Sequence, residues 1–360
     1  MRHLRVLVVD DSAYNRRTIT ELLQALPDVE VVGKATDGDE ALRMVSELQP
    51  DLITLDLEMP RMDGFTFLRL LMARRPTPVI IVSGYSAKEN VFRALELGAI
   101  DFIAKPTRAV TSDLGAITQE LSEMVNMVRQ LSPAGLDPAL RPAPMPVAAP
   151  TPSSESFAVP KGAAPAPAGE PPKYVVVVAA STGGPTALVE VFRRLPAVGQ
   201  AAVLVAQHMP ERFTKTFAER LNRLGGMRVR EAAGEQKLTA GTAYVCPGGR
   251  CLEVGSVGGE LVGRVVPVEP SDRYVPSCDR LFESAAKAAG KRVIGVVLTG
   301  MGDDGSRGVV AIKEAGGVVL AEAADTAVIY GMPGAAVRTG SVDRSLPLRQ
   351  LAERLAELVS

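Results

Sequence analysis

Tryptophan is absent from this chain of 360 residues, and aromatic residues of all kinds make up 4% of it. Proteins that bind single-stranded nucleic acid stack its bases on aromatic side chains, so this scarcity argues against that class of function. An excess of either charge is also missing, because 40 Lys and Arg residues stand against 41 Asp and Glu, for a net charge of −1. The balance gives no sign of a nucleic-acid or anionic-membrane partner, and a transcription regulator would need a basic recognition helix.

Cysteines and long apolar runs are scarce as well. Cys246, Cys251 and Cys278 are odd in number and lack the spacing of metal ligands, a pattern typical of small buried side chains in a reducing cytoplasm. The longest apolar runs, such as residues 175–180, are too short to cross a bilayer, and residues 1–5 lead straight into a strand-like run with no signal-peptide pattern. We therefore expect a cytoplasmic protein without membrane insertion.

The composition changes sharply after about Leu131. Residues 133–172 contain 12 Pro and 10 Ala among 40 positions, so this stretch cannot bury enough apolar surface to fold and lacks many backbone donors. A length of 360 residues suits two domains or three. The sequence therefore predicts a first domain over residues 1–130, a Pro/Ala-rich linker over residues 131–172 and a second domain over residues 173–360.

Short apolar runs alternate with amphipathic segments in both domains, which predicts α/β folds with parallel sheets covered on both faces. The strand-like runs are residues 4–10, 29–35, 51–57, 78–84 and 101–106, then 174–180, 201–207, 293–299 and 316–322. A Gly-rich stretch over residues 227–267 contains Tyr244–Val245 and Leu252–Val254 separated by turns. It predicts a local antiparallel excursion from the second sheet.

Charged and polar side chains follow the expected strands of the first domain. Asp10 and Asp11 end the first strand, Asp56 the third, Ser83 the fourth and Lys105 the fifth. The carboxyl ends of parallel strands meet at one edge of a sheet, so these side chains should face one crevice. Three close carboxylates repel one another unless a cation lies among them, and oxygen ligands suit Mg²⁺. The cluster predicts a site that holds a metal ion and a phosphoryl group together.

The motifs DD, LDLEMPRMDG, VSG and FIAKP, in this order, make residues 3–128 resemble a response-regulator receiver domain. The resemblance implies a doubly wound, flavodoxin-like fold in which a chemotaxis histidine kinase phosphorylates Asp56 with the help of Mg²⁺. The implied metal ligands are Asp10, Asp11, Asp56 and the backbone carbonyl of Glu58. The implied switch residues are Ser83 and Lys105, which bind the phosphoryl group, and Phe102, which reorients.

Ser181 and His208 each follow a strand-like run of the second domain. Ser181 comes after six apolar residues and opens a segment, TGGPTALVEVF, that turns helical. A helix N-terminus offers free N–H groups and a positive dipole end, although a serine there is most often only a cap. His208 ends the next run and is the only histidine of this domain. It could take the serine proton and return it to a leaving alcohol.

A third group lies in LTGMGDDG, residues 298–305, which ends another strand-like run. An aspartate here would orient the histidine and stabilise its protonated form. The glycines leave backbone N–H groups free, so Met301 becomes a candidate oxyanion donor. Physical reasoning alone does not choose between Asp303 and Asp304 for the orienting role.

The same segment contains a competing motif. Gly300, Gly302 and Gly305 form G-x-G-x-x-G, and Glu322 follows about where a ribose-binding acid would stand. A dinucleotide site is therefore the alternative interpretation. The charge of two aspartates in the loop that would receive a pyrophosphate argues against it.

The blocks AASTGGPTAL, AQHMPERFTKTFAERLN, YVCPGG, PSCDRLFESAA, LTGMGDDG and YGMP make residues 173–350 resemble the catalytic domain of chemotaxis protein-glutamate methylesterases. With the receiver in front, the whole chain resembles the response-regulator form of that enzyme. The implied Rossmann-like domain hydrolyses γ-glutamyl methyl esters on chemoreceptor cytoplasmic helices, releases methanol and deamidates particular glutamines, with no cofactor for the ester chemistry. The implied catalytic residues are Ser181 as nucleophile, His208 as base and acid, and Asp304 as orienting carboxylate, with Thr182 and the Met301 backbone at the oxyanion.

The resemblance also implies a mode of control, within a two-component chemotaxis pathway. The unphosphorylated receiver would lie across the catalytic crevice, and phosphorylation of Asp56 would loosen it. A non-enzymatic signalling adaptor, whose second domain only binds a partner, is the competing class of function. The complete set of Ser181, His208 and an aspartate argues against an adaptor.

Overall fold

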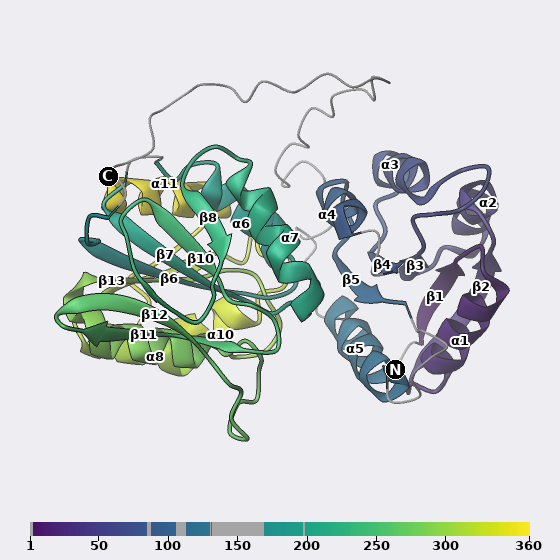
Figure 1. Cartoon of the computed structure of the whole chain (residues 1–360). Coiled ribbons are helices and arrows are strands. Elements are labelled where there is room, and N and C mark those ends of the chain that lie inside the picture. The colour runs from purple at the N-terminus through teal and green to yellow at the C-terminus, as the bar shows by residue number, and fades with distance from the viewer. Residues whose placement is uncertain (1–2, 85–87, 106–112, 130, 132–168, 197–198) are drawn as a thin grey trace, which may run out of the picture.

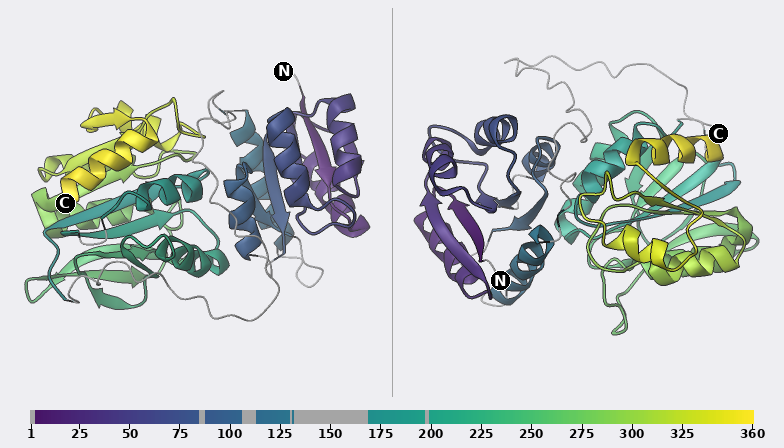
Figure 2. Two further views of the ribbon diagram at one scale, coloured as in Figure 1. Left: turned by 90° about the horizontal axis from the view of Figure 1, so that it is seen from above. Right: turned by 180° about the vertical axis from the view of Figure 1, so that it is seen from behind.

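The chain folds into two α/β domains, which lie side by side in each view of Figures 1 and 2. The computed structural model describes residues 3–84, 88–105, 113–129, 131, 169–196 and 199–360. The expected linker over residues 131–172 lies almost wholly outside these ranges, so its boundaries stay a prediction. Within these ranges, every helix is too short or too polar to cross a bilayer.

The first domain is a five-stranded parallel sheet in the order β2-β1-β3-β4-β5, the doubly wound arrangement that its alternating runs predict. Helices α1 and α5 cover one face, and α2 and α3 cover the other. The strands are β1 (Leu4–Val9), β2 (Val29–Ala35), β3 (Leu52–Leu55), β4 (Val79–Ser83) and β5 (Asp101–Ala104). The helices are α1 (Ala13–Gln24), α2 (Gly38–Leu48), α3 (Gly64–Arg74), α4 (Lys88–Glu96) and α5 (Asp113–Val128).

Short polar side chains begin three of these helices. Ser12, Asp37 and Asp63 each accept a hydrogen bond from the N–H of the third residue after them, which fixes where α1, α2 and α3 begin. The loops that lead into α1 and α2 are short, whereas residues 56–63 separate β3 from α3. Asp10 and Asp56 directly follow β1 and β3, which keeps them close to the edge of the sheet.

The second domain is a seven-stranded parallel sheet in the order β15-β14-β13-β6-β7-β10-β8. Helices α6, α7 and α11 cover one face, and α8, α9 and α10 cover the other. The strands of this sheet are β6 (Tyr174–Ala180), β7 (Ala201–Gln207), β8 (Arg228–Glu231), β10 (Thr242–Val245), β13 (Val293–Val297), β14 (Val318–Glu322) and β15 (Arg344–Leu346). The helices are α6 (Gly184–Phe192), α7 (Glu211–Asn222), α8 (Cys278–Ala289), α9 (Ser306–Glu314), α10 (Met332–Arg338) and α11 (Leu348–Val359).

The antiparallel excursion exists, but its membership differs from the prediction. The three-stranded antiparallel sheet consists of β9 (Glu235–Lys237), β11 (Cys251–Val257) and β12 (Glu260–Val266). Residues Tyr244–Val245 do not belong to it, because β10 pairs in parallel with both β7 and β8. The four residues of β10 are all buried. A strand covered on both faces lacks the polar alternation that marks a strand with one solvated face, so a short apolar run leaves the pairing open.

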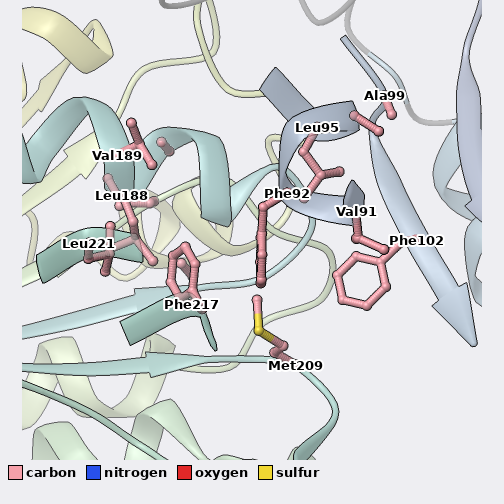
Figure 3. Packing of buried hydrophobic residues seen from close by; sticks show 14 of the residues in the cluster. Val91, Phe92, Leu95, Ala99, Phe102, Leu188, Val189, Met209, Phe217 and Leu221 are labelled. Carbon is pink, nitrogen blue, oxygen red and sulfur yellow. The ribbon is translucent and has the colours of Figure 1, made fainter. Parts of the chain in front are cut away.

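A continuous apolar cluster joins the two domains. Phe92 of α4 stacks on Phe217 of α7 with ring centroids 5.4 Å apart, and Phe102 of β5 lies 4.5 Å from Phe213 of α7. Figure 3 shows Phe92 pointing from α4 toward Phe217 and Met209 of the second domain. Buried aromatic pairs of this kind contribute both apolar burial and ring–ring attraction. The face of the first domain formed by α4 and β5 is therefore packed against α7.

Ion pairs flank this cluster on the same face of the first domain. Arg223 Nη2 of α7 donates to Glu89 Oε1 of α4 at 2.7 Å, and Arg220 pairs with Glu96. The Arg220 and Glu96 side chains are each 16% exposed, whereas Arg223 and Glu89 are more than half exposed. The Arg220–Glu96 pair is therefore shielded from solvent, and the exposed Arg223–Glu89 pair contributes less to the stability of the interface.

Candidate active site

Ser181, His208 and Asp304 lie in loops that follow three neighbouring strands of the large sheet. These strands are β6, β7 and β13, and β6 lies between the other two. Between β6 and β13 the chain reverses the direction in which it adds strands, which is where open α/β sheets place their ligand sites. The three side chains therefore meet at one carboxyl edge of the sheet.

Two hydrogen bonds connect the three side chains. His208 Nδ1 lies 3.2 Å from Ser181 Oγ, and His208 Nε2 lies 2.9 Å from Asp304 Oδ2. The imidazole is 16% exposed and the Asp304 carboxylate 2%. With the ring proton on Nε2, Nδ1 is free to accept the serine proton while Asp304 holds the opposite edge of the ring. The geometry is that of a nucleophile, a base and a group that orients the base.

The first turn of α8 holds the Asp304 carboxylate. The N–H of Cys278 donates to Asp304 Oδ2 at 2.8 Å, and the N–H of Asp279 donates to Oδ1 at 3.0 Å. These N–H groups have no acceptor inside their own helix and lie at its positive dipole end. Burial alone would raise the pKa of Asp304, but the hydrogen bond and charge of His208 and these two N–H groups hold it below its ordinary value. The carboxylate therefore stays charged beside the imidazole.

Asp303, the other candidate for the orienting role, faces away from the imidazole edge. Its side chain is 55% exposed, and its Oδ1 accepts hydrogen bonds from Tyr274 Oη at 3.0 Å and from Arg273 Nη1 at 3.3 Å. Asp304 is buried and contacts His208, and Asp303 does neither. The structure thus separates the two adjacent carboxylates that physical reasoning on the sequence left open.

The two groups expected at the oxyanion have different surroundings. The N–H of Met301 has no hydrogen-bond acceptor among the described residues, so it is available to an anionic oxygen. The hydroxyl of Thr182 is already engaged, because Oγ1 donates to Asp101 Oδ2 of the receiver at 2.7 Å. The Thr182 carbonyl accepts a hydrogen bond from Thr299 Oγ1 at 2.9 Å. Asp101 of the first domain therefore binds the hydroxyl of Thr182, the residue next to Ser181.

Asp101 is a residue that sequence reasoning missed. It begins β5 and lies partly buried between the domains, 81 positions from Thr182. Burial raises the pKa of Asp101 to about 6, although the Thr182 hydroxyl and the Phe102 N–H act to lower it. An aspartate at the start of a strand carries no signal of a contact with another domain, so the sequence offered no means of finding it.

The acidic cluster of the receiver gathers at the carboxyl edge of its sheet. Lys105 Nζ lies 2.5 Å from Asp56 Oδ2 and 3.2 Å from Asp10 Oδ2. One oxygen from each of Asp10, Asp11 and Asp56 lies within 4.8 Å of the others. Burial raises the pKa of Asp56 to about 6, against the lowering effect of Lys105. Asp10 Oδ2 is buried, and its contact among the described residues is the ion pair with Lys105, which is not aligned as a hydrogen bond; the oxygen therefore keeps the capacity to bind a cation such as Mg²⁺.

The remaining receiver residues lie at this edge or in the interface. The Glu58 N–H donates to Asp56 Oδ1 at 3.3 Å, which places the Glu58 backbone beside the cluster. Ser83 ends β4, is buried and donates to the Gly84 carbonyl at 3.3 Å. Phe102 is buried against the second domain rather than exposed. A reorientation of Phe102 would therefore disturb the packing between the domains.

Comparison with known proteins connects this geometry to a family. Residues 176–355 match the family model for the CheB methylesterase, and residues 6–112 match that for the response regulator receiver domain. The chain is 47% identical over 364 residues to protein-glutamate methylesterase/protein-glutamine glutaminase 3 of Geobacter sulfurreducens, with 99% of this chain and 98% of that protein covered. The chain belongs to the CheB methylesterase family.

Two further comparisons cover the same ground. Protein-glutamate methylesterase/protein-glutamine glutaminase 1 of Myxococcus xanthus is 46% identical, over 99% of this chain and 97% of that protein. The crystal structure of the Thermotoga maritima CheB methylesterase catalytic domain is 35% identical with a TM-score of 0.50, over 52% of this chain and 98% of that one. The full-length relatives therefore match both halves of the chain, and the esterase domain resembles a structure solved on its own.

Glu322, the residue that would bind the ribose in the dinucleotide interpretation, is not accessible to a ligand. Glu322 is fully buried, and its carboxylate accepts hydrogen bonds from the Thr299 N–H at 2.8 Å and from Thr326 Oγ1 at 3.0 Å. Burial raises the pKa of Glu322 to about 7. A carboxylate enclosed in this way supports the loop that carries the Thr299 hydroxyl and is not open to a ligand. This agrees with membership of the CheB methylesterase family.

One group of potential metal ligands in the described part of the esterase domain coincides with the triad. His208, Cys278 and Asp304 each place a donor atom within 4.8 Å of the others. Burial raises the pKa of the Cys278 thiol well above its ordinary value, so the sulfur stays protonated, and both Asp304 oxygens already accept N–H groups. All three cysteines of the chain are buried, as the sequence predicts. These surroundings suit proton transfer in this CheB-type site.

Proposed function

We propose that this chain is a phosphorylation-activated hydrolase that removes methyl groups from glutamate 5-O-methyl esters on chemoreceptor cytoplasmic helices. Methanol is the second product, and the same site deamidates particular receptor glutamines. The observation that carries the proposal is the hydrogen-bonded chain from Ser181 through His208 to Asp304. The names of the full-length relatives, protein-glutamate methylesterase/protein-glutamine glutaminase, supply the substrate class.

Acylation follows from the protonation states that the site favours. Ser181 Oγ attacks the ester carbonyl as its proton passes to His208 Nδ1, 3.2 Å away. The charged Asp304 carboxylate stabilises the imidazolium through the Nε2–H, and the free Met301 N–H is placed to bind the developing oxyanion. Collapse of the tetrahedral intermediate breaks the bond to the methoxy oxygen, which leaves as methanol with the proton from Nδ1.

Deacylation uses the same groups in reverse order. A water molecule gives its proton to His208 Nδ1 and attacks the glutamyl–Ser181 ester. The intermediate then expels Ser181, which recovers its proton, and the receptor keeps a glutamate carboxylate. A glutamine side chain enters the same cycle with ammonia as the leaving group. Apart from the substrate and this water molecule, the proposed steps use only groups of the chain itself.

We further propose that the docked receiver inhibits the esterase. Its α4 and β5 face packs on α7, and Asp101 engages the hydroxyl adjacent to the nucleophile. A histidine kinase of the chemotaxis pathway would phosphorylate Asp56. Asp10, Asp11 and the Glu58 carbonyl would hold Mg²⁺, which neutralises charge around the phosphoryl group when bound. Lys105 and Ser83 then bind phosphoryl oxygens, and movement of Phe102 loosens the interface.

Replacement of the nucleophile tests the esterase directly. Ser181→Ala should lower the release of methanol from methylated receptor by about 10⁴-fold or more, because no other described group replaces the attacking oxygen. Mass spectrometry of receptor peptides before and after incubation identifies the sites. The companion variant Ser360→Ala changes an exposed hydroxyl at the chain end and should match the unaltered protein. Methanol release by Ser181→Ala at the normal rate would remove Ser181 as nucleophile.

The adaptor alternative makes a different prediction for chemical labelling. A serine-directed phosphonate should label Ser181 in the unaltered chain, and His208→Ala should abolish the labelling, since the serine then lacks its base. An adaptor without an active nucleophile would show no labelling in either protein.

A further inference from the structure

Tyr274 covers one face of the catalytic imidazole. The rings of Tyr274 and His208 are nearly parallel, with an interplanar angle of 8° and centroids 5.4 Å apart. The tyrosine is partly buried and belongs to the segment between β12 and α8, so it reaches the site from outside the strand ends that carry the triad. The mechanism given above assigns it no role.

Two neighbours fix the position of the Tyr274 ring. Its hydroxyl donates to Asp303 Oδ1 at 3.0 Å, and Arg273 Nη1 donates to the same oxygen at 3.3 Å. Burial and the hydrogen bond to Asp303 raise the pKa of Tyr274, so the phenol stays protonated and able to donate. Gly302 makes room for it, because a Cβ at that position would lie 2.5 Å from Tyr274 Oη. The ring is thus tied to the same loop that carries Asp304.

The segment that carries Tyr274 is also anchored at its base. Arg280 of α8 donates to the Pro267 carbonyl at 3.2 Å, to Asp272 Oδ2 at 2.7 Å and to Glu253 Oε1 at 2.6 Å. The Arg280 side chain is 15% exposed, so these charge-assisted bonds are shielded from solvent. Because the Tyr274 hydroxyl is hydrogen-bonded and the nearby Asp272 is anchored, the ring has little freedom to swing away from the imidazole.

We propose that Tyr274 is a positioning residue for His208, held in place by Asp303, and that it keeps the imidazole in the plane that points Nδ1 at Ser181. The two adjacent carboxylates then have different roles. Asp304 binds the edge of the His208 imidazole, and Asp303 binds the Tyr274 ring that lies on the face of that imidazole. This inference rests on the proposed esterase function.

The stacked ring has two physical effects on the base. The Tyr274 ring blocks rotation of the imidazole away from the orientation in which it contacts both Ser181 and Asp304. It also keeps water from one face of the imidazole. Its π face also attracts the imidazolium that forms during each half-reaction, because a cation over an aromatic ring is stabilised by the ring quadrupole. The other groups with polar atoms against the imidazole are Ser181, Asp304 and the Cys278 thiol, which substitution of Tyr274 leaves in place.

Two variants of the full-length chain separate positioning from mere packing. Tyr274→Leu keeps an apolar side chain but removes the aromatic face, and Tyr274→Phe keeps the ring but removes the hydroxyl. Hydrolysis of a small activated ester, p-nitrophenyl acetate, is measured from pH 5 to 9, together with the rate of labelling by a serine-directed phosphonate. We expect Tyr274→Leu to lower kcat about 10-fold with KM within about 2-fold. The acid limb of its pH profile should move to lower pH by about 0.5 to 1 pH unit. Tyr274→Phe should keep most of the kcat of the unaltered protein and leave the acid limb close to its original pH.

Three outcomes would overturn the inference. They are an unchanged kcat and pH profile in Tyr274→Leu, a rise in KM with kcat unchanged, or an equal loss in Tyr274→Phe and Tyr274→Leu without the displaced acid limb. The second outcome would make Tyr274 a substrate contact, and the third a purely structural residue. Ser181→Ala serves as the reference for the chemistry itself. If that variant retains hydrolysis and labelling, the proposed function fails, whereas its loss together with a normal Tyr274→Leu protein overturns only the role of Tyr274.

Discussion

Phe92→Ala should release the esterase from the receiver without phosphorylation. Phe92 is 2% exposed in the docked chain, and its ring stacks on Phe217 and meets Phe213 edge to face, both on α7. If about half of its buried surface faces α7, roughly 75–100 Å² leaves water on docking, which contributes about 2 kcal/mol. The aromatic pairs add about 1 kcal/mol, so removal of the ring should shift the docking equilibrium by about 100-fold toward the open form.

Methanol release from methylated receptor measures the effect. The unphosphorylated Phe92→Ala protein should approach the rate of phosphorylated unaltered protein, and of a fragment that begins at Lys173. Phosphorylation should then add little. Phe65→Ala is the control, since Phe65 lies on α3 and its ring contacts Arg93 of α4 inside the receiver instead of packing on α7 as Phe92 does. A basal rate in Phe92→Ala equal to that of the unaltered protein, with both proteins equally folded, would refute inhibition through this interface.

Two further predictions concern the carboxylates at the site. Asp304→Asn should lower kcat by about 10⁴-fold, because the histidine loses the group that fixes its tautomer, while Asp303→Asn should cost less than about 10-fold; comparable losses would refute the assignment. Burial raises the pKa of Asp101 to about 6 in the docked state, above its ordinary value near 4, so docking is strongest at low pH and weakens as pH rises through 6. The ratio of unphosphorylated to phosphorylated rates, which cancels titration of the shared triad, should therefore rise several-fold from pH 5 to 7 and stay flat in Asp101→Asn. A flat ratio in the unaltered chain would contradict this.

The fold could be predicted well from the sequence because its main signals are local. Alternating apolar runs marked the strands, and the residues that follow them mark the functional edge of each sheet. The assignment of Tyr244–Val245 to the antiparallel excursion was wrong, since β10 is buried on both faces and joins the parallel sheet. The pairing of a short apolar strand depends on distant neighbours, which a run of four residues does not specify.

The residues of the site also fall into those that local signals in the sequence predict and those that they do not. Ser181, His208 and Asp304 follow strands, so their convergence at one edge follows from the topology of a parallel sheet. The choice of Asp304 over Asp303 depends on the first turn of α8, whose N–H groups receive only one of the two carboxylates. Asp101 and Tyr274 reach the site from the receiver and from the segment between β12 and α8. Neither position has a periodicity or motif that indicates such a contact.

The triad is assembled from residues that lie far apart along the chain, 27 positions from Ser181 to His208 and 96 from His208 to Asp304. Non-local contacts of this kind form late in folding, after the intervening segments have been ordered. A nascent polypeptide still on the ribosome therefore has its nucleophile long before it has the means to activate it. Hydrolysis begins only when synthesis has passed β13 and α8, by which time the amino-terminal receiver has already been made. In the order of the two domains along the chain, the domain that we propose as the inhibitor is thus made before the activity that it would restrain.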